Sequence, residues 1–515
     1  MQAVTWARSP QGKTIGVLLL PALALVALTW GLIGRFYYTL DDAYIHLQLA
    51  EMIGQQGHFG LHLSSVSSPS SSLLWTLWLS AWAWLPIGFD YVPLITNLLV
   101  LALLSQDLYR WLHQRLIQPE NTPWFLVAML LSLNAYWLSV SGMEQLTQAW
   151  LTVRVMVAVS QQHWQKPSLY VALIALALIR YESLALCLPV LLLATRYGAT
   201  TKALTTLLII VLGLATYSLY LHKGLGLGWL PASVQIKSVF SELTDRSLAP
   251  FGAAIAENLH FVMQQEYNRY LIWLGIGWLT AGRDRLGRQL MWIATLVYLA
   301  HALFGRVNSG RYEIYVLACC WIATLHNSAH WIERFLANNT RRVIFLLLVI
   351  VLNSGNFFSG FSAPWAAKNI HDQQGQLAIL VQDYLRQPVA VNDVGLISRG
   401  NPQPVLDLVG LGTSGVYELR HGMGAQSHWV DILLKKHQTH YAIVYDHWFP
   451  SWPSHLIPVA TLETPGPLFT PAGRRVSLYA DSPEHAEHLR RAIKLYHQDH
   501  PSQSTWFTLR EADDS

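Results

Sequence analysis

Long uncharged stretches alternate with short polar segments over the first 360 residues of the chain. A helix needs about 20 apolar residues to cross a bilayer, and shorter stretches must tilt or borrow flanking residues. The pattern predicts a polytopic α-helical membrane protein with about eleven spans. The predicted spans lie in the runs 15–33, 70–86, 92–104, 124–140, 145–159, 169–195, 203–221, 270–281, 289–304, 312–325 and 343–359.

The pattern changes near residue 361, where the long apolar runs stop. Strand-like segments such as PVAVNDVGLI, QPVLDLVGL, YAIVYDHW and RRVSLYA then alternate with helix-like segments such as 373–385 and 482–497. Alternating strands and helices are typical of an α/β domain, and about 150 residues is an ordinary domain size. We therefore expect a mostly α fold with a transmembrane domain at 1–360 and a soluble α/β domain at 361–515.

A long polar loop, residues 34–69, separates the first two runs. Its segment AYIHLQLAEMI has the spacing of an amphipathic helix, with Ile45, Leu49 and Ile53 on one face. We expect this helix to lie on the membrane surface with that face in the lipid. The Ser-rich segment 64–72 that follows is either a linker, a helix cap or a contact for a polar ligand.

Basic residues indicate the orientation. Arg8 and Lys13 precede the first run, which predicts a cytoplasmic N-terminus. The arginine-rich loops at 283–288 and 334–342 are predicted to be cytoplasmic as well, so 222–269 and everything after 360 face outside. Arg110 and Arg115 disagree with this orientation, because an odd number of predicted spans precedes them and places their loop outside. We attribute the disagreement to residues 169–194, which form either one long helix or two short ones broken at 180–182.

Composition agrees with a membrane protein: 52% of the residues are hydrophobic and 12% are charged, against about 25% in an average soluble domain. The three cysteines fall in apolar runs without zinc-ligand spacing, so we interpret them as small core residues. The net charge is +4, and no basic cluster carries the interleaved aromatic residues that suit nucleic acid. No nucleic-acid partner is expected.

Two adjacent acids, Asp41 and Asp42, follow the first run, and His46 lies one helical turn after Asp42. A carboxylate pair at the membrane boundary costs solvation energy, so such acids are candidates for function. The alternative is that one of them caps the helix that begins there. One acid is enough for a cap, so two acids followed by a histidine favour a site.

Further polar residues interrupt apolar surroundings. Glu144 has the alternative role of a loop end, and Arg180 and Glu182 that of a structural ion pair. Lys237 and Arg311 have the alternative role of interfacial anchors. Together with Tyr312 they distribute cations and carboxylates over several predicted spans, which suits an anionic lipid-linked substrate.

Several of these segments resemble one family in the same order. The blocks are DDAYIHLQLAEMI, SGMEQLTQAWL, LIRYESLALCL, LGWLPASVQIKS, GRYEIYVL and NDVGLI…VLDLVGL. They resemble polytopic glycosyltransferases of the GT-C fold, and most of all the bacterial group that includes terminal arabinofuranosyltransferases. The chain departs from that group where Gly-Met-Glu replaces G-L-E and Arg-Tyr-Glu-Ser replaces R-P-E-G.

The resemblance implies an enzyme of the bacterial inner membrane. The implied enzyme transfers a sugar, such as arabinofuranose, from a polyprenyl-phosphate donor to an extracytoplasmic glycan, lipid or protein. The resemblance also implies Asp41 as general base and Asp42 as a residue that orients the acceptor or binds a metal. The implied mechanism is a single displacement with inversion at the sugar. A divalent cation, Mg²⁺ or Mn²⁺, would be held by Asp41 and Asp42. The implied substrate-binding residues are His46, Glu144, Arg180, Glu182, Lys237, Arg311 and Tyr312.

Two other classes compete with an enzyme. A transporter or flippase of lipid-linked or polar envelope substrates also keeps buried ions, but the chain shows no inverted repeat. The position of Asp41 and Asp42, in an external cleft or in a midplane cavity, separates these two classes. A non-catalytic scaffold, the third class, has no need of the aspartates.

Overall fold

The structure, a computed structural model, describes residues 9–510 except 86–87, 238–247, 265, 306–309, 424–427, 450 and 504–505. The helices of the first part are α2 (Pro10–Ile33), α3 (Asp42–Gln56), α4 (Leu73–Trp82), α5 (Val92–Arg115), α6 (Thr122–Ser132), α7 (Ala135–Val140), α8 (Gln145–Ser160), α9 (Pro167–Ile179), α10 (Leu184–Arg196), α11 (Thr200–Leu219), α12 (Ala232–Lys237), α13 (Leu248–Gln264), α14 (Tyr270–Thr280), α15 (Arg285–Phe304), α16 (Ile314–Phe335), α17 (Asn339–Leu352) and α18 (Ser354–Ile370).

The remaining elements form the C-terminal part. Its helices are α19 (Gln376–Ile379), α20 (Gly395–Ser398), α21 (Val416–Met423), α22 (Trp429–Lys436) and α23 (Pro483–Asp499). Its strands are β1 (Val389–Val391), β2 (Val405–Asp407), β3 (Tyr441–Val444), β4 (Ile457–Glu463), β5 (Arg475–Ala480) and β6 (Phe507–Leu509). They form one sheet in the order β2-β1-β3-β5-β4-β6, parallel from β2 to β3 and antiparallel beyond.

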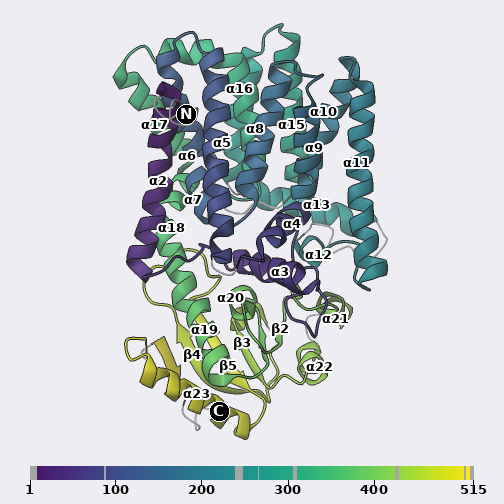
Figure 1. Ribbon diagram of the computed structural model, residues 1–515, viewed down its shortest axis with the longest axis vertical. Coiled ribbons are helices and arrows are strands. Elements are labelled where there is room, and N and C mark those ends of the chain that lie inside the picture. The colour runs from purple at the N-terminus through teal and green to yellow at the C-terminus, as the bar shows by residue number, and fades with distance from the viewer. Residues whose placement is uncertain are drawn as a thin grey trace.

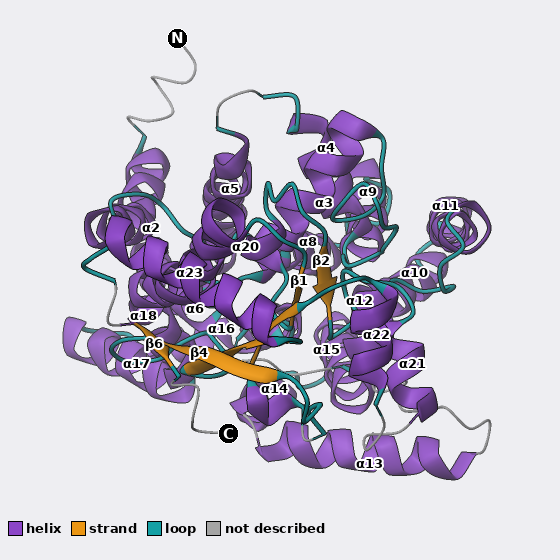
Figure 2. Ribbon diagram, turned by 90° about the horizontal axis from the view of Figure 1, so that it is seen from below, coloured by secondary structure: helices purple, strands orange, loops and turns teal. Residues whose placement is uncertain are grey.

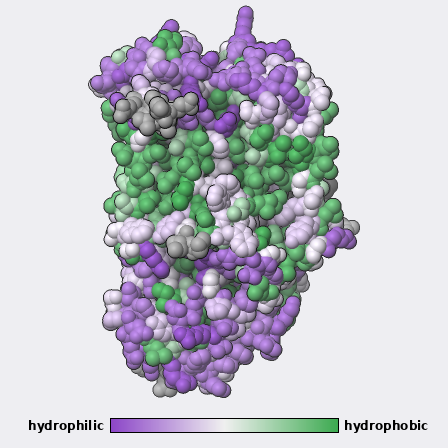
Figure 3. Space-filling view, viewed as in Figure 1, coloured by the Kyte–Doolittle hydropathy of each residue, from purple (hydrophilic) through white to green (hydrophobic). Residues whose placement is uncertain are grey.

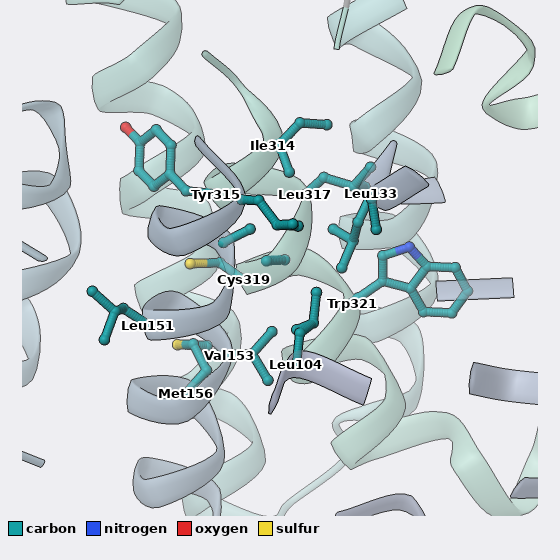
Figure 4. Packing of buried hydrophobic residues seen from close by; sticks show 14 of the residues in the cluster. Leu104, Leu133, Leu151, Val153, Met156, Ile314, Tyr315, Leu317, Cys319 and Trp321 are labelled. Atoms are coloured by element: carbon teal, nitrogen blue, oxygen red, sulfur yellow. The ribbon is translucent and has the colours of Figure 1, made fainter. Parts of the chain in front are cut away.

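Long helices run side by side in a bundle, and the sheet with its helices lies at one end of it (Figures 1 and 2). On the face that Figure 3 shows, a hydrophobic belt covers the bundle, with hydrophilic surface on either side of it. Helix α16 is central and is buried along most of its length. Its Cys319 and Trp321 pack with Met156 of α8 and Leu104 of α5 (Figure 4). All three cysteines are buried and free, as the sequence predicted.

Three helical stretches among the described residues are long and apolar enough to cross a membrane: Pro10–Ile33, Phe89–Arg115 and Thr200–Gly224. A fourth arises if Asn339–Leu352 and Ser354–Leu385, which meet at a bend of 83°, count as one span. The expected membrane-protein fold thus has direct support from these stretches and the hydrophobic belt. The count of eleven spans stays a prediction.

The run 70–86 is not a span by length. Its helix α4 has ten residues, or about 15 Å, against about 30 Å of bilayer core, and it packs on α3. The start of α5 lies near the C-terminal part, since Asp90 there pairs with Arg399 at 2.8 Å. Arg115, at the other end of α5, donates to the carbonyl oxygen of His326 in the second half of α16. If α4 does not cross the membrane, the loop with Arg110 and Arg115 comes to the cytoplasmic side without the attribution to residues 169–194, and the topology stays a prediction.

Residues 169–195 form two short helices, α9 and α10, with Tyr181–Ser183 between them. Of the two alternatives left open by the sequence, this is the broken one. The break places Arg180 and Glu182 at a turn rather than inside a span.

The apolar face of α3 packs against protein. Ile45 and Leu49 are buried in a core that they share with residues of the C-terminal part, such as Val391 and Leu377. The prediction that this face enters the lipid is therefore wrong. An amphipathic pattern shows that a face needs an apolar neighbour, and here that neighbour is the C-terminal part.

Residue 361 lies inside a continuous helical stretch, Ser354–Leu385, which joins the bundle to the sheet. This stretch includes two π-helical turns, His371–Gly375 and Leu380–Leu385. The predicted strands at β1, β2, β3 and β5 are present, whereas β4 and β6 were not predicted. The division into domains at 360 and 361 stays a prediction.

Candidate functional site

Asp41 lies where α3 meets the short helix α20. Its two carboxylate oxygens accept hydrogen bonds from the backbone N–H groups of Gly395 at 2.7 Å and Leu396 at 2.8 Å. A Cβ at Gly395 would lie 2.2 Å from the Asp41 backbone oxygen, so only glycine allows this approach. The Asp41 side chain makes no capping bond to α3. The hypothesis that it caps its own helix is wrong, because its carboxylate binds a segment more than 350 residues away.

Asp42 faces the other way, toward the bundle. Its carboxylate accepts from the guanidinium of Arg311 at 3.0 Å, just before α16. The guanidinium of Arg311 lies 5.0 Å from the centre of the Tyr312 ring, and that of Arg180 lies 4.7 Å from it. Two cations therefore share one aromatic ring, which attracts positive charge through its electron-rich faces.

Arg180 connects this pair to buried acids. Its guanidinium donates to Glu144 at 2.6 Å and also to Glu182. Glu144 is fully buried, and the second oxygen of its carboxylate lies 3.7 Å from His46 Nε2. The other ring nitrogen of His46 lies 3.2 Å from the hydroxyl of Ser70, in the Ser-rich segment. The structure thus joins most of the predicted site residues in one polar network. Its members are Asp42, His46, Glu144, Arg180, Glu182, Arg311 and Tyr312.

Lys237 is the exception among the predicted site residues. Its backbone ends α12, while its side chain lies outside the described residues. Ser233 and Val234 of the same helix line the cavity described below. The role of Lys237 stays a prediction.

Asp393, two residues after the end of β1, was not among the predicted site residues. Its carboxylate accepts from the amide of Gln374 at 2.8 Å and from the hydroxyl of Tyr445 at 2.9 Å. Asp393 and Tyr445 follow the carboxyl ends of the neighbouring parallel strands β1 and β3. Ligands commonly bind at this edge of a sheet, so the position of Asp393 in the VAVND segment was the available signal.

Burial and like charge act on these acids. Burial raises the pKa of Asp41 to about 8, with a further contribution from Asp393, although the two backbone N–H groups oppose the shift. Burial also raises the pKa of Asp393 above its usual range. A carboxyl group whose pKa lies near neutral is suited to accept a proton during a reaction.

A cavity of about 400 Å³ adjoins the network. Its polar end is formed by Arg180, Glu182 and Tyr312, and Ser71 also lines it. Its remaining walls are mainly apolar and come from α10, α12 and α15: Leu184, Ala185, Leu188, Val234, Ala300 and Phe304. A slot with one charged end and apolar walls fits a molecule with an anionic head and a hydrocarbon tail.

The residues offer a weak fit to the expected divalent cation. Both oxygens of Asp41 accept backbone N–H groups, and Asp42 is paired with Arg311. Within the described part of the chain, the group with metal-ligand spacing is His440, Asp481 and His485, which lies elsewhere. The cation at Asp41 and Asp42 stays a prediction.

Comparisons with known proteins bear on the fold. Residues 368–479 match a family described as a domain of unknown function (DUF8728), and no curated protein matches the chain in sequence. The chain is similar to the crystal structure of ArnT from Cupriavidus metallidurans in the apo state, with a TM-score of 0.50 and 12% identity over 94% of this chain and 99% of that one. The crystal structure of ArnT from the same organism bound to undecaprenyl phosphate has a TM-score of 0.48 and 12% identity over 91% of this chain and 99% of that one.

The first of these similarities shows that the chain has an ArnT-like fold over nearly its whole length. The GT-C-like architecture expected from the sequence is confirmed at that level. The relation to arabinofuranosyltransferases in particular stays a prediction.

Proposed function

We propose that the protein is a membrane glycosyltransferase that takes a sugar from a polyprenyl-phosphate donor and transfers it to an acceptor outside the cytoplasm. The observation that carries this proposal is the polar network itself. Arg180 and Glu182 line a mainly apolar cavity, and the network continues behind them through the ion pair of Arg180 with the buried Glu144 and through the Tyr312 ring to Arg311. The ArnT-like fold supports the same class of enzyme.

The cations suit the leaving group. A departing polyprenyl phosphate develops negative charge, and fixed donors in a dry site stabilise such charge strongly. Arg311 Nε is a buried donor for which the described residues provide no acceptor. Buried donors of this kind are rare unless a ligand completes them. Arg180 and Arg311 would therefore hold the phosphate, and the apolar walls of the cavity would hold the first part of the lipid.

Asp41 suits the role of general base. It takes a proton from the acceptor hydroxyl, whose oxygen then attacks the anomeric carbon as the bond to phosphate breaks. A single displacement of this kind inverts the anomeric centre. Asp42 orients Arg311 through their ion pair. A pentofuranose such as arabinofuranose is the sugar that the sequence resemblance suggests.

A transporter or flippase would need its acids in a cavity at the middle of the bundle. Asp41 instead contacts α20 of the C-terminal part, at the end of the bundle (Figure 1). This position favours the enzyme. The decisive experiment is an assay of the purified protein in detergent with polyprenyl-phosphate sugars as donors, with mass spectrometry of the products and of the envelope glycans from cells that lack the protein.

Filling the cavity should weaken donor binding. Ala185→Phe on α10 adds a ring to the apolar wall, and forcing extra atoms into packed space costs about 1–3 kcal/mol, which is roughly 5- to 150-fold. We expect KM for a long-chain donor to increase about tenfold or more. Leu192→Phe, at an exposed position of the same helix, is the matched control. Equal KM values for the two variants would show that the lipid of the donor does not bind in this cavity.

The rate should depend on pH through Asp41. A general base works only when deprotonated, so kcat/KM should increase as the pH rises through the raised pKa of Asp41, about 8. Asp393→Asn removes a negative neighbour, lowers that pKa and should shift the rise to lower pH. A rise that is complete at pH 5 in the unmodified protein would contradict the assignment of Asp41 as base.

A further inference from the structure

Two histidines and an aspartate meet at the edge of the C-terminal sheet. His440 comes directly before β3 and Asp481 directly after β5, and the antiparallel pairing of Tyr441 with Ala480 places them side by side. His485 belongs to the first turn of α23, four residues after Asp481. Three separate elements therefore contribute one side chain each to the same place.

The two imidazoles converge on the one carboxylate. One oxygen of Asp481 lies 2.6 Å from His440 Nδ1, and the other lies 2.6 Å from His485 Nδ1. The two rings stack with their centres 4.2 Å apart at 23°, which fixes their positions relative to each other. The side chains are 44%, 28% and 31% exposed for His440, Asp481 and His485, so an ion can reach them from solvent.

We propose that His440, Asp481 and His485 bind one divalent transition-metal ion of the Zn²⁺ class. The candidate ligand atoms lie within 4.8 Å of one another, so small movements suffice to surround an ion. Two imidazole nitrogens with one carboxylate oxygen are a ligand set for Zn²⁺, Ni²⁺ or Co²⁺, whereas Mg²⁺ and Ca²⁺ prefer oxygen ligands alone. Water or a further group completes the coordination.

Binding exchanges protons for the ion. Each imidazole gives up its proton at Nδ1, to Nε2 or to solvent, and the lone pair then faces the metal.

This metal site is separate from the proposed catalytic site. Asp393 and Tyr445 follow the carboxyl ends of β1 and β3, whereas His440 precedes β3. It therefore lies at the opposite end of these strands. In Figure 1, the strands β3 and β5 and the helix α23 lie in the part of the molecule away from the bundle. An ion here would cross-link β3, β5 and α23, so its main effect would be on the stability of the C-terminal part.

The test uses the full-length protein in detergent, purified without a polyhistidine tag and freed of metal. Titration with Zn²⁺, followed by calorimetry and elemental analysis, should give one bound ion per chain and a higher unfolding temperature. Co²⁺ should give the visible absorption bands of a site with nitrogen ligands. Asp481→Asn keeps the shape of the side chain but loses the charge. This variant and His440→Ala should each lower the affinity at least about tenfold, the cost of losing even an outer partner of a metal ligand.

His428→Ala is the matched control, because His428 is an exposed histidine of the same region that pairs with a different aspartate, Asp431. The control variant should bind Zn²⁺ like the unmodified protein. The proposal is overturned if the unmodified protein binds no Zn²⁺, if both cluster variants bind it normally, or if only His428→Ala loses it.

Discussion

Asp41→Asn is expected to lower sugar transfer by about 10²- to 10⁴-fold, the usual contribution of a general base, in a protein that still folds. An amide cannot take the acceptor proton at neutral pH. Its oxygen can still accept one of the two backbone N–H groups of Gly395 and Leu396, so the contact with α20 is weakened but retained. Turnover with a polyprenyl-phosphate sugar and the unfolding temperature should be measured together.

The matched control for Asp41 is Asp90→Asn. It weakens the ion pair between Asp90 and Arg399, which also joins the first part of the chain to the C-terminal part. If transfer falls equally in both variants, the loss comes from a loosened contact rather than from a missing base.

Asp42→Asn, made separately, should also reduce transfer, because Arg311 loses its charged partner. Normal turnover in both Asp41 and Asp42 variants would leave the pair with a structural role only.

Arg180→Gln is expected to lower both transfer and stability. Glu144 is fully buried and pairs with Arg180 at 2.6 Å, and a buried ion pair that loses one partner typically costs about 3–5 kcal/mol. Loss of a charge-stabilising donor at a reacting group typically costs about 10²- to 10³-fold in kcat. Thermal unfolding and kinetics with the same preparation would separate the two effects.

The double variant Arg180→Gln with Glu144→Gln decides between the two roles of Arg180. It removes the uncompensated carboxylate, so stability should largely return, whereas transfer should stay low because the phosphate still lacks its cation. Glu144→Gln alone is the reference for this comparison. Recovery of transfer in the double variant would show that Arg180 serves only to neutralise Glu144.

Local sequence patterns predicted a strand correctly where both the length of the run and its residue types are typical of strands. The strands β1 and β3 come from short apolar runs bounded by polar residues, and they were predicted. Strand β4 was missed because Pro458 lies within its run, and proline argues against a strand. The structure accommodates it where the pairing of β4 with β5 shifts register, between Pro458 and Ala460.

The site was predictable in its residue types and less so in its partners. The acids and cations stood out because they interrupt apolar surroundings. The ion pair of Arg180 with Glu182 is local and was weighed from the sequence, whereas the contacts of Arg180 with Glu144 and of Gly395 with Asp41 join distant segments. Asp393 was missed although its position after a predicted strand was a local signal, because its partners Gln374 and Tyr445 come from other segments. The boundary near residue 361 marks a real change of composition, but the helix passes through it, because backbone hydrogen bonds within a helix do not depend on its surroundings.

The helical stretch Ser354–Leu385 restricts how the gene of such a protein can change over evolutionary time. Each residue turns a helix by about 100°. One codon inserted or deleted between Ser354 and Gln374 would therefore rotate the Gln374 side chain away from Asp393. The π-helical turn His371–Gly375 is itself a local widening that sets the present phase. Loops elsewhere in the chain can lengthen or shorten freely by comparison. Among relatives that keep this site, the number of residues between the bend at 353 and Gln374 should therefore be the least variable length in the protein.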